Sequence, residues 1–573
     1  MRKHIAISRR TSLLPLAAAV VVALTCGTQA QAGDCNDTDQ TLESLRPDKG
    51  VQAWAAWMRL GRGASAALTQ VSPDHRTTVV RNCNDQGSGS LRNAVSNASS
   101  GDTIDLGQLH CSTITLTSGA IEIGVDDLTL RGSRHHTLRI DGNHADRVLY
   151  DSGAGTLTVS DLTVTRGRTV AESETNLGGC LLIGGALTLN RVKLTDCAVV
   201  GDQARGGGAF VYGPLIVSDS FISGNTAEGT LLALGGGFFA YGGATVARSQ
   251  IVGNAIAGTS AGYGTEAAGG GIFVRQDLDM SDSTISGNTS TASSNYSYYP
   301  AKANEGGGFV GGAATLIRSS VSGNAAQSIV AVSDAASYAY AYSYGGGMRA
   351  VYMDILDSTI SGNSASAVAS NSQGVAIELS RGGGLTTFTL EHVEPVIRLR
   401  NSTVSGNSVS HSPPAPELYS YARGGGVFGN AGTLDLQNST IAFNTADSGG
   451  GIYQNRAQSV SAESTIVSNN TFESGGSDFD VGEAISVSGA NNLVTSASAN
   501  LTLPGGTLSA DPKLAALDDN GGPTLTHALR SDSPAINAGN NLAGFHFDQR
   551  GHGFPRKVGR ATDIGAFEKR SGH

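Results

Sequence analysis

The stretch GGGMRAVYMDILDSTISGN, residues 345–363, decides the fold, because its pattern occurs eight times along the chain. Each copy begins with three glycines and ends on an asparagine, which follows the third glycine by 16 to 18 residues in seven of the eight copies. A serine stands five residues before this asparagine, and Ile or Val stands three residues before it. The eight asparagines are Asn225, Asn254, Asn288, Asn324, Asn363, Asn407, Asn444 and Asn469.

Eight such copies cannot form eight domains, since a unit of about 22 residues buries its apolar face only against a neighbour. Apolar and small polar residues alternate without a helical period, which is typical of short strands. We therefore predict an all-β, right-handed parallel β-helix over residues 111–500, with about ten to thirteen coils stacked roughly 4.8 Å apart. Both open ends need a cover. We expect a short helical N-terminal cap within residues 33–110 and an irregular C-terminal cap over residues 501–573.

The asparagines are predicted to form one structural ladder, because equivalent side chains of stacked coils lie above one another and their amides can bond to each other. Ligand binding by these amides is the alternative. Glycine precedes six of the asparagines, from Gly224 to Gly406, and would supply the positive φ of the turn. Residues 178–202 form an imperfect ninth copy, with Asp202 expected at the ladder position.

Charged residues occupy the position before the repeated serine in the first five copies. They alternate in sign: Asp219, Arg248, Asp282, Arg318 and Asp357. We expect ion pairs between neighbouring coils, each of small energetic value.

The stretch between each asparagine and the next glycine triplet varies in length and sequence. We predict loops here that leave the coils at one corner. A row of exposed tyrosines in these loops would bind a glycan or a surface protein; alternatively, the rings pack on one another and keep the loops ordered. The candidate binding residues are ten of the fifteen tyrosines, namely Tyr263, Tyr296, Tyr298, Tyr299, Tyr338, Tyr340, Tyr342, Tyr344, Tyr419 and Tyr421.

Residues 1–32 have the features of a signal peptide. Four basic residues precede an apolar run from Leu13 to Leu24, and Ala30-Gln31-Ala32 fits a cleavage site. The run is too short to span a bilayer, so we expect no transmembrane segment after cleavage. The protein is expected to be secreted or held at the outer surface of a Gram-negative-type bacterium, with the periplasm and the export route left open. Cleavage changes the formal charge from −10 to −14, which disfavours nucleic acid as a partner.

Five cysteines remain after cleavage, in a compartment that favours disulfides. We predict the pairs Cys83–Cys111 and Cys180–Cys197. Cys35 is then left free or bonded to another molecule.

Two groups of short motifs mark the ends of the mature chain. The first consists of Gly87-Ser88-Gly89-Ser90-Leu91-Arg92 and Gly101-Asp102-Thr103-Ile104, and the second includes Asp511-Pro512-Lys513-Leu514, Ser533-Pro534-Ala535-Ile536, Asp548-Gln549-Arg550-Gly551 and Asp563-Ile564-Gly565-Ala566-Phe567-Glu568. With these motifs the chain resembles bacterial exported proteins that join polymorphic-outer-membrane-type β-helix repeats to a C-terminal choice-of-anchor Q region. The resemblance implies a right-handed β-helix of largely unestablished activity, often supposed to be an adhesin.

An enzyme is the alternative function class, because many right-handed β-helices are lyases or hydrolases of acidic polysaccharides. Such chemistry needs two suitably spaced carboxylates, or a base with a cation that stabilises an enolate. Gly551-His552-Gly553 is similar to a polygalacturonase motif but lies in the expected cap, and Asp126-Asp127 and Asp518-Asp519 fit turns. A cleft along the coils with carboxylates beside Lys or Arg would favour the enzyme.

Neither a calcium-binding repeat nor a zinc-type spacing of Cys or His residues occurs in the sequence. We therefore assign no catalytic residue, no metal ligand and no cofactor. The favoured function is that of a non-catalytic protein that presents a repetitive adhesive surface.

Overall fold

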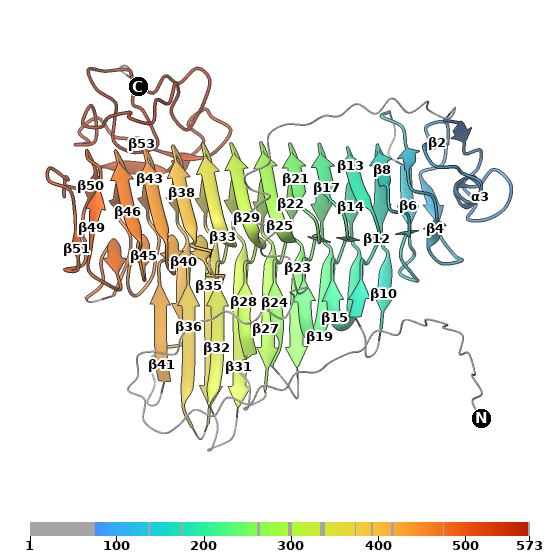
Figure 1. Ribbon diagram of the computed structural model, residues 1–573, viewed down its shortest axis with the longest axis horizontal. Coiled ribbons are helices and arrows are strands. Elements are labelled where there is room, and N and C mark those ends of the chain that lie inside the picture. Colours follow the sequence, from blue (N-terminus) through green and yellow to red (C-terminus); the bar gives the residue numbers. More distant parts are fainter. Residues whose placement is uncertain are drawn as a thin grey trace, which may run out of the picture. The chain divides into compact units, whose positions relative to one another are not determined.

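A computed structural model describes residues 75–570, apart from 136–137, 172–174, 261–263, 296–300, 333–337, 373, 391–392, 414–417 and 474. Within this part the predicted fold is confirmed: three long sheets of parallel strands wind into a right-handed parallel β-helix (Figure 1). No helix among the described residues is long and apolar enough to cross a membrane. The predicted signal peptide and Cys35 lie outside the described residues.

The middle coils contribute strands to all three sheets, as the coil that begins at Gly345 illustrates. Its strand β33 (Met348–Leu356) belongs to the first sheet, named sheet A, and β34 (Thr359–Ser361) belongs to sheet B. β35 (Ser364–Asn371) then runs outward in sheet C, and β36 (Ala376–Arg381) returns in the same sheet. The next glycine triplet follows the returning strand and begins the next coil.

Sheet B displays the repeat most plainly, because each coil gives it one short strand. Neighbouring strands pair in parallel, with the repeated aliphatic residue of one coil beside that of the next. Within the described residues its 13 strands are β3 (Thr113–Thr115), β6 (Leu138–Asp141), β9 (Leu162–Thr165), β14 (Lys193–Thr195), β18 (Phe221–Ser223), β22 (Gln250–Val252), β26 (Thr284–Ser286), β30 (Ser320–Ser322), β34, β39 (Thr403–Ser405), β44 (Thr440–Ala442), β47 (Ile466–Ser468) and β50 (Leu493–Val494).

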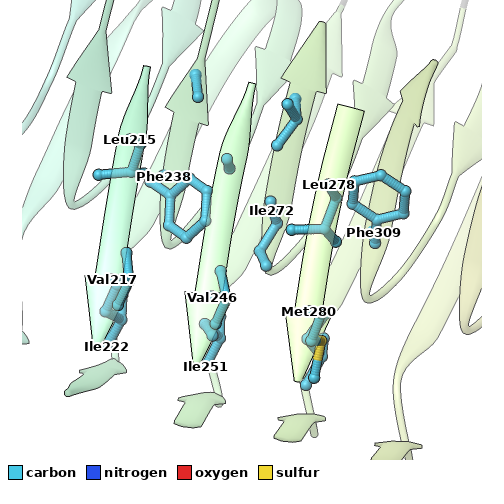
Figure 2. Packing of buried hydrophobic residues seen from close by; sticks show 14 of the residues in the cluster. Leu215, Val217, Ile222, Phe238, Val246, Ile251, Ile272, Leu278, Met280 and Phe309 are labelled. Carbon is cyan, nitrogen blue, oxygen red and sulfur yellow. The ribbon is translucent and has the colours of Figure 1, made fainter. Parts of the chain in front are cut away.

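A continuous apolar core fills the inside of the coils. Figure 2 shows Leu215, Val217 and Ile222 of one coil beside the corresponding residues of the next, Val246 and Ile251 among them. These side chains are fully buried. Each buried methylene group contributes about 0.8 kcal/mol, so the repeated aliphatic positions supply most of the driving force for stacking.

The asparagine ladder satisfies every polar atom of its buried amides, as Asn324 shows. Its Nδ2 donates to Asn363 Oδ1 at 2.9 Å and to the Ile285 carbonyl at 3.0 Å. Its Oδ1 accepts from the backbone N–H of Asn288 at 3.0 Å and from Asn288 Nδ2 at 2.9 Å. The structure places Asn225, Asn254, Asn288, Asn324, Asn363, Asn407 and Asn444 in one such line.

The two ends of the ladder differ from the predicted register. Asn444 donates to Asn470 Oδ1 at 2.9 Å, so Asn470 occupies the eighth position and the prediction of Asn469 is wrong. Asn469 instead has φ +61° and fills the turn position that glycine takes in other copies, a conformation that Asn tolerates. At the other end Cys197, and not Asp202, occupies the ladder position, because the backbone N–H of Cys197 donates to Asn225 Oδ1.

The glycine triplets are a steric requirement of close stacking. Gly269 has φ +72°, which an L side chain rarely adopts. A Cβ on Gly270 would lie 2.4 Å from the Gly307 carbonyl oxygen of the next coil, and one on Gly271 would lie 3.0 Å from the Asn288 amide. The triplet therefore lets the backbone pass between the next coil and the ladder.

The stretches predicted as loops are mostly strands of sheet C, which is a correction. They form a projection with an outgoing and a returning limb, here named the flange (Figure 1). The outgoing limb includes β23 (Ala255–Ser260), β27 (Thr289–Ser294), β31 (Ala325–Val332), β35 and β40 (Ser408–His411). The returning limb includes β24 (Glu266–Ala268), β28 (Ala301–Glu305), β32 (Ala339–Tyr344), β36 and β41 (Leu418–Arg423). Small side chains pack between the limbs, Ala341, Ala367 and Ala376 among them, which explains why the pattern resembled a loop.

At the N-terminal end, parallel pairing begins before the predicted boundary at residue 111. β1 (Thr77–Val79) and β2 (Asp102–Asp105) already belong to sheet A. Between them lies α3 (Leu91–Ser96), with Ser90 as its N-cap, a short helix as expected for this region. Both predicted disulfides, Cys83–Cys111 and Cys180–Cys197, are confirmed.

The C-terminal segment, which follows β51 (Leu501–Thr502), is mainly irregular and lies on the outer face of sheet B. The fully buried Gln549 bridges two coils: its Nε2 donates to Thr359 Oγ1 at 2.8 Å and its Oε1 accepts from Thr403 Oγ1 at 2.6 Å. The backbone N–H of Ala566 donates to Thr440 Oγ1 at 3.0 Å. The segment thus covers the flank of several coils.

Candidate functional site

The outer face of the returning limb carries five of the six described tyrosines of the predicted set, and the sixth, Tyr344, is buried at its base. In β32 the alternate residues Tyr340 and Tyr342 point away from the alanine-lined interior, because strand side chains alternate between faces. Parallel pairing of β32 with β36, and of β36 with β41, places side chains of the next two coils beside these tyrosines in register. The resulting surface, here named the tyrosine face, consists of Tyr338, Tyr340, Tyr342, Ile377, Leu379, Tyr419 and Tyr421.

Exposure varies along the tyrosine face. Tyr338, Tyr419 and Tyr421 are 50%, 51% and 43% exposed, whereas Tyr344 at the base of the flange is buried. The rings of β32 also contact one another, with centroids 5.8 Å apart for Tyr338 and Tyr340. The rings therefore contact one another along the limb, and its outer end still presents aromatic surface to solvent.

Two arginines fix the base of this face against sheet A. The Arg381 guanidinium lies 5.6 Å from the Tyr344 ring centroid and 5.1 Å from that of Phe428. Arg423 lies 4.9 Å from both Tyr421 and Tyr453. Such cation–π contacts stabilise by about 0.5–2 kcal/mol each and hold the returning limb at a set orientation to sheet A.

The buried Glu378 ties the two limbs together. Its carboxylate accepts the backbone N–H of Ala369 at 2.6 Å and both the backbone N–H and the hydroxyl of Ser412, at 2.8 and 2.6 Å. The tyrosine face is therefore built on strands with a hydrogen-bonded interior. The remaining predicted binding residues, Tyr263, Tyr296, Tyr298 and Tyr299, lie outside the described residues.

A second candidate surface is a cleft of about 610 Å³ on the outer face of sheet B in the early coils. Threonines and charged residues line it: Thr113, Thr115, Arg139, Asp141, Thr163, Thr165, Arg166, Lys193, Thr195 and Asp196. The sequence motifs do not reveal this cleft. Its signal is the outward position of four successive strands, β3, β6, β9 and β14, which becomes recognisable only once the register is known.

The charges in this cleft divide into paired and unpaired groups. Asp141 accepts from Arg166 Nε at 3.0 Å and from the backbone N–H of Asn143 at 2.8 Å, so its carboxylate is occupied. Arg139 and Lys193 are exposed and lie on either side of Thr163 in the strand register. Neither forms an ion pair within the part of the chain that the structure describes. At about 4.8 Å per strand, these two cations are roughly 10 Å apart.

The alternating charges form ion pairs between coils. Arg248 binds Asp219, and Arg318 binds Asp282, each through two contacts of 2.7 Å. The arginine hydrogen bonds lower the pKa of Asp219 and of Asp282. These exposed pairs add little to stability. Asp357 has Asn401 as its partner instead, and burial raises its pKa to about 6.

The other carboxylates and the histidine considered for catalysis lie apart from both surfaces. Asp126 and Asp127 accept backbone N–H groups of Ala154 and Thr156 in the next coil. Asp519 accepts the N–H of Gly521 within a turn. His552 is exposed, with its ring centroid 5.5 Å from that of Phe547. These contacts are structural.

No family model and no curated protein matches the chain. Among solved structures, the chain is similar to pectate lyase Pel9A at 13% identity, with a TM-score of 0.31 over 86% of this chain and 96% of that one. A likeness at this level says nothing about the activity of the present protein.

Proposed function

We propose that this chain is an exported, non-catalytic β-helix protein that binds its ligand on the tyrosine face. The observation that supports the proposal most is the in-register order of Tyr340, Ile377 and Tyr419 on three adjacent strands, with Tyr342, Leu379 and Tyr421 beside them. Monomeric proteins seldom leave such contiguous aromatic and aliphatic surface in water unless a partner covers it. Tyrosine also offers a flat ring and a hydroxyl, which suit a sugar ring or a protein surface.

The signal-peptide pattern, the two disulfides and the resemblance to choice-of-anchor Q proteins support the exported part of the proposal. We place the protein outside the cytoplasm, either released or retained at the outer surface. In this proposal the chain acts as an adhesin, and its ligand is a glycan or a surface protein.

The test compares binding of the wild type and a Tyr338→Ser, Tyr419→Ser, Tyr421→Ser triple variant to a glycan array and to immobilised mucin. Loss of three exposed rings should weaken binding at least tenfold, because aromatic residues dominate such surfaces. Tyr150→Ser is the matched control, since Tyr150 is 39% exposed but lies on sheet A, away from the flange. Unchanged circular dichroism would show that the triple variant is folded. Equal binding by wild type and triple variant would overturn the proposal.

Binding or cleavage of an acidic polysaccharide in the sheet B cleft is the second candidate function. The two unpaired cations, Arg139 and Lys193, support it, since they suit successive carboxylates or sulfates of a polymer. Incubation with pectin and alginate distinguishes the two: cleavage that is lost in Lys193→Met would favour the enzyme. Turnover of neither polymer, with binding lost only in the tyrosine variant, would exclude this candidate for both substrates.

A further inference from the structure

Three potential metal ligands converge where the flange meets the last coils. His411 ends β40, while Asp447 and Glu473 each follow a ladder asparagine by three residues, Asn444 and Asn470. One ligand atom of each side chain lies within 4.8 Å of the other two. Stacking brings the three together from consecutive coils, although they are far apart in the sequence.

The orientation of His411 leaves an acceptor directed at a carboxylate. Its Nδ1 lies 2.6 Å from the Ser412 carbonyl oxygen, which only accepts, so Nδ1 carries the proton. Its Nε2 lies 2.9 Å from Asp447 Oδ2. A neutral imidazole would set two acceptors against each other here, so either Nε2 is protonated or one cation binds both atoms.

Neighbouring hydrogen bonds hold the ligands in place. The Ser412 carbonyl that orients His411 is itself fixed, because the N–H and the hydroxyl of Ser412 donate to the buried Glu378. Asp447 Oδ2 also accepts the backbone N–H of Ala422 at 3.0 Å. A backbone carbonyl on the second nitrogen of a histidine, with hydrogen bonds to the carboxylates, is the usual outer shell of a metal site.

We propose that His411, Asp447 and Glu473 bind Zn²⁺. One imidazole nitrogen and two carboxylate oxygens suit Zn²⁺, whereas Ca²⁺ takes six to eight oxygen ligands. Glu473 is exposed, so a water molecule completes a four-coordinate site. Bound Zn²⁺ joins three consecutive coils beside the base of the flange and acts independently of the tyrosine face.

The test is calorimetric titration of the EDTA-treated full chain with ZnCl₂ near pH 7.5. We expect one ion per chain, a dissociation constant in the micromolar range or below, and a Zn²⁺-dependent rise in the midpoint of thermal unfolding. His411→Ala should abolish binding. Glu473→Gln should weaken it at least tenfold and, as an exposed change, should leave folding intact. His552→Ala, on an exposed histidine of the C-terminal segment, is the control and should bind as the wild type does.

Two results would overturn the zinc site. One is no saturable binding by the wild type, which would leave a proton-bridged ion pair between His411 and Asp447. The other is equal binding by Glu473→Gln, His411→Ala and the wild type, which would place the ion elsewhere.

Discussion

At the residue scale, the stack depends on ladder asparagines whose buried amides hydrogen-bond from coil to coil. Asn470 shows this, since its amide accepts from Asn444 and donates to Asp478 Oδ1 at 2.9 Å, where the ladder ends. Its neighbour Asn469 has the same chemistry but a different role, because φ and not hydrogen bonding decides its position. Adjacent identical residues therefore provide a test of the register.

Asn470→Gly should destabilise the last coils by about 2–4 kcal/mol, because buried groups of Asn444 and Asp478 lose their partners. Asn469→Gly, at positive φ, should cost less than about 1 kcal/mol. Thermal unfolding and amide hydrogen exchange at Asn444 measure both. If Asn469→Gly were the more damaging change, the register would be wrong.

Asp357 gives the protein a pH dependence of known sign. Burial raises its pKa from 3.8 to about 6, so the folded state binds the proton more tightly than the unfolded state does. The resulting destabilisation is absent below about pH 4 and complete above about pH 6. Asp357→Asn retains an acceptor for Asn401 and tolerates φ +52°. It should stabilise the protein at pH 7.5 by roughly 1–2 kcal/mol and at pH 4 hardly at all. Denaturant unfolding at both pH values measures this, and equal effects would contradict it.

At the element scale, the glycine triplet that connects sheet C to sheet A tolerates substitution as little as a buried strand does. Because the triplet passes between the ladder and the next coil, a single methyl group meets backbone that cannot move without shifting a whole coil. The flange obeys the same rule in another form. Its alanine and serine interior lets two limbs approach closely, and the pairing comes from the neighbouring coils.

Gly270→Ala should therefore lower the midpoint of thermal unfolding by several degrees or prevent soluble expression, since its Cβ would lie 2.4 Å from the Gly307 carbonyl oxygen and 2.5 Å from that of Thr289. Gly505→Ala is the matched control, because a Cβ there meets nothing within 4 Å and φ is not positive. A tolerated Gly270→Ala would show that the coils can separate at the triplet.

At the scale of the described coils and the C-terminal segment, the two parts of sheet B have different surroundings. The early coils expose the charged cleft, whereas the segment that contains Gln549 covers β34, β39 and β44. The covered flank buries Ile466, Leu493 and Ile564 in a second apolar cluster. The segment therefore stabilises the late coils and covers their side of sheet B, whereas the outer face of sheet B in the early coils stays open to a ligand.

Gln549→Ala should release this segment, because four hydrogen bonds of a fully buried amide are lost. Limited proteolysis with mass spectrometry should then find faster cleavage after residue 503 while the coils remain resistant. Gln250→Ala, on the exposed face of β22, should leave the cleavage pattern unchanged. First cleavage within the coils would argue against the assigned role.

The sequence by itself determined the β-helix, the ladder from Asn225 to Asn444, both disulfides and the tyrosine-bearing stretches, because a stacked coil repeats its constraints at fixed spacing. It left the last coil ambiguous, since Ser464 and Thr465 both suit the serine position. Only the tertiary structure showed that the variable stretches pair into a flange, because their strand order depends on neighbours 36 to 42 residues away. The same holds for the Arg139–Lys193 cleft and for His411, Asp447 and Glu473. Stacking sets side chains from different coils a few ångströms apart, and no local spacing in the sequence records that proximity.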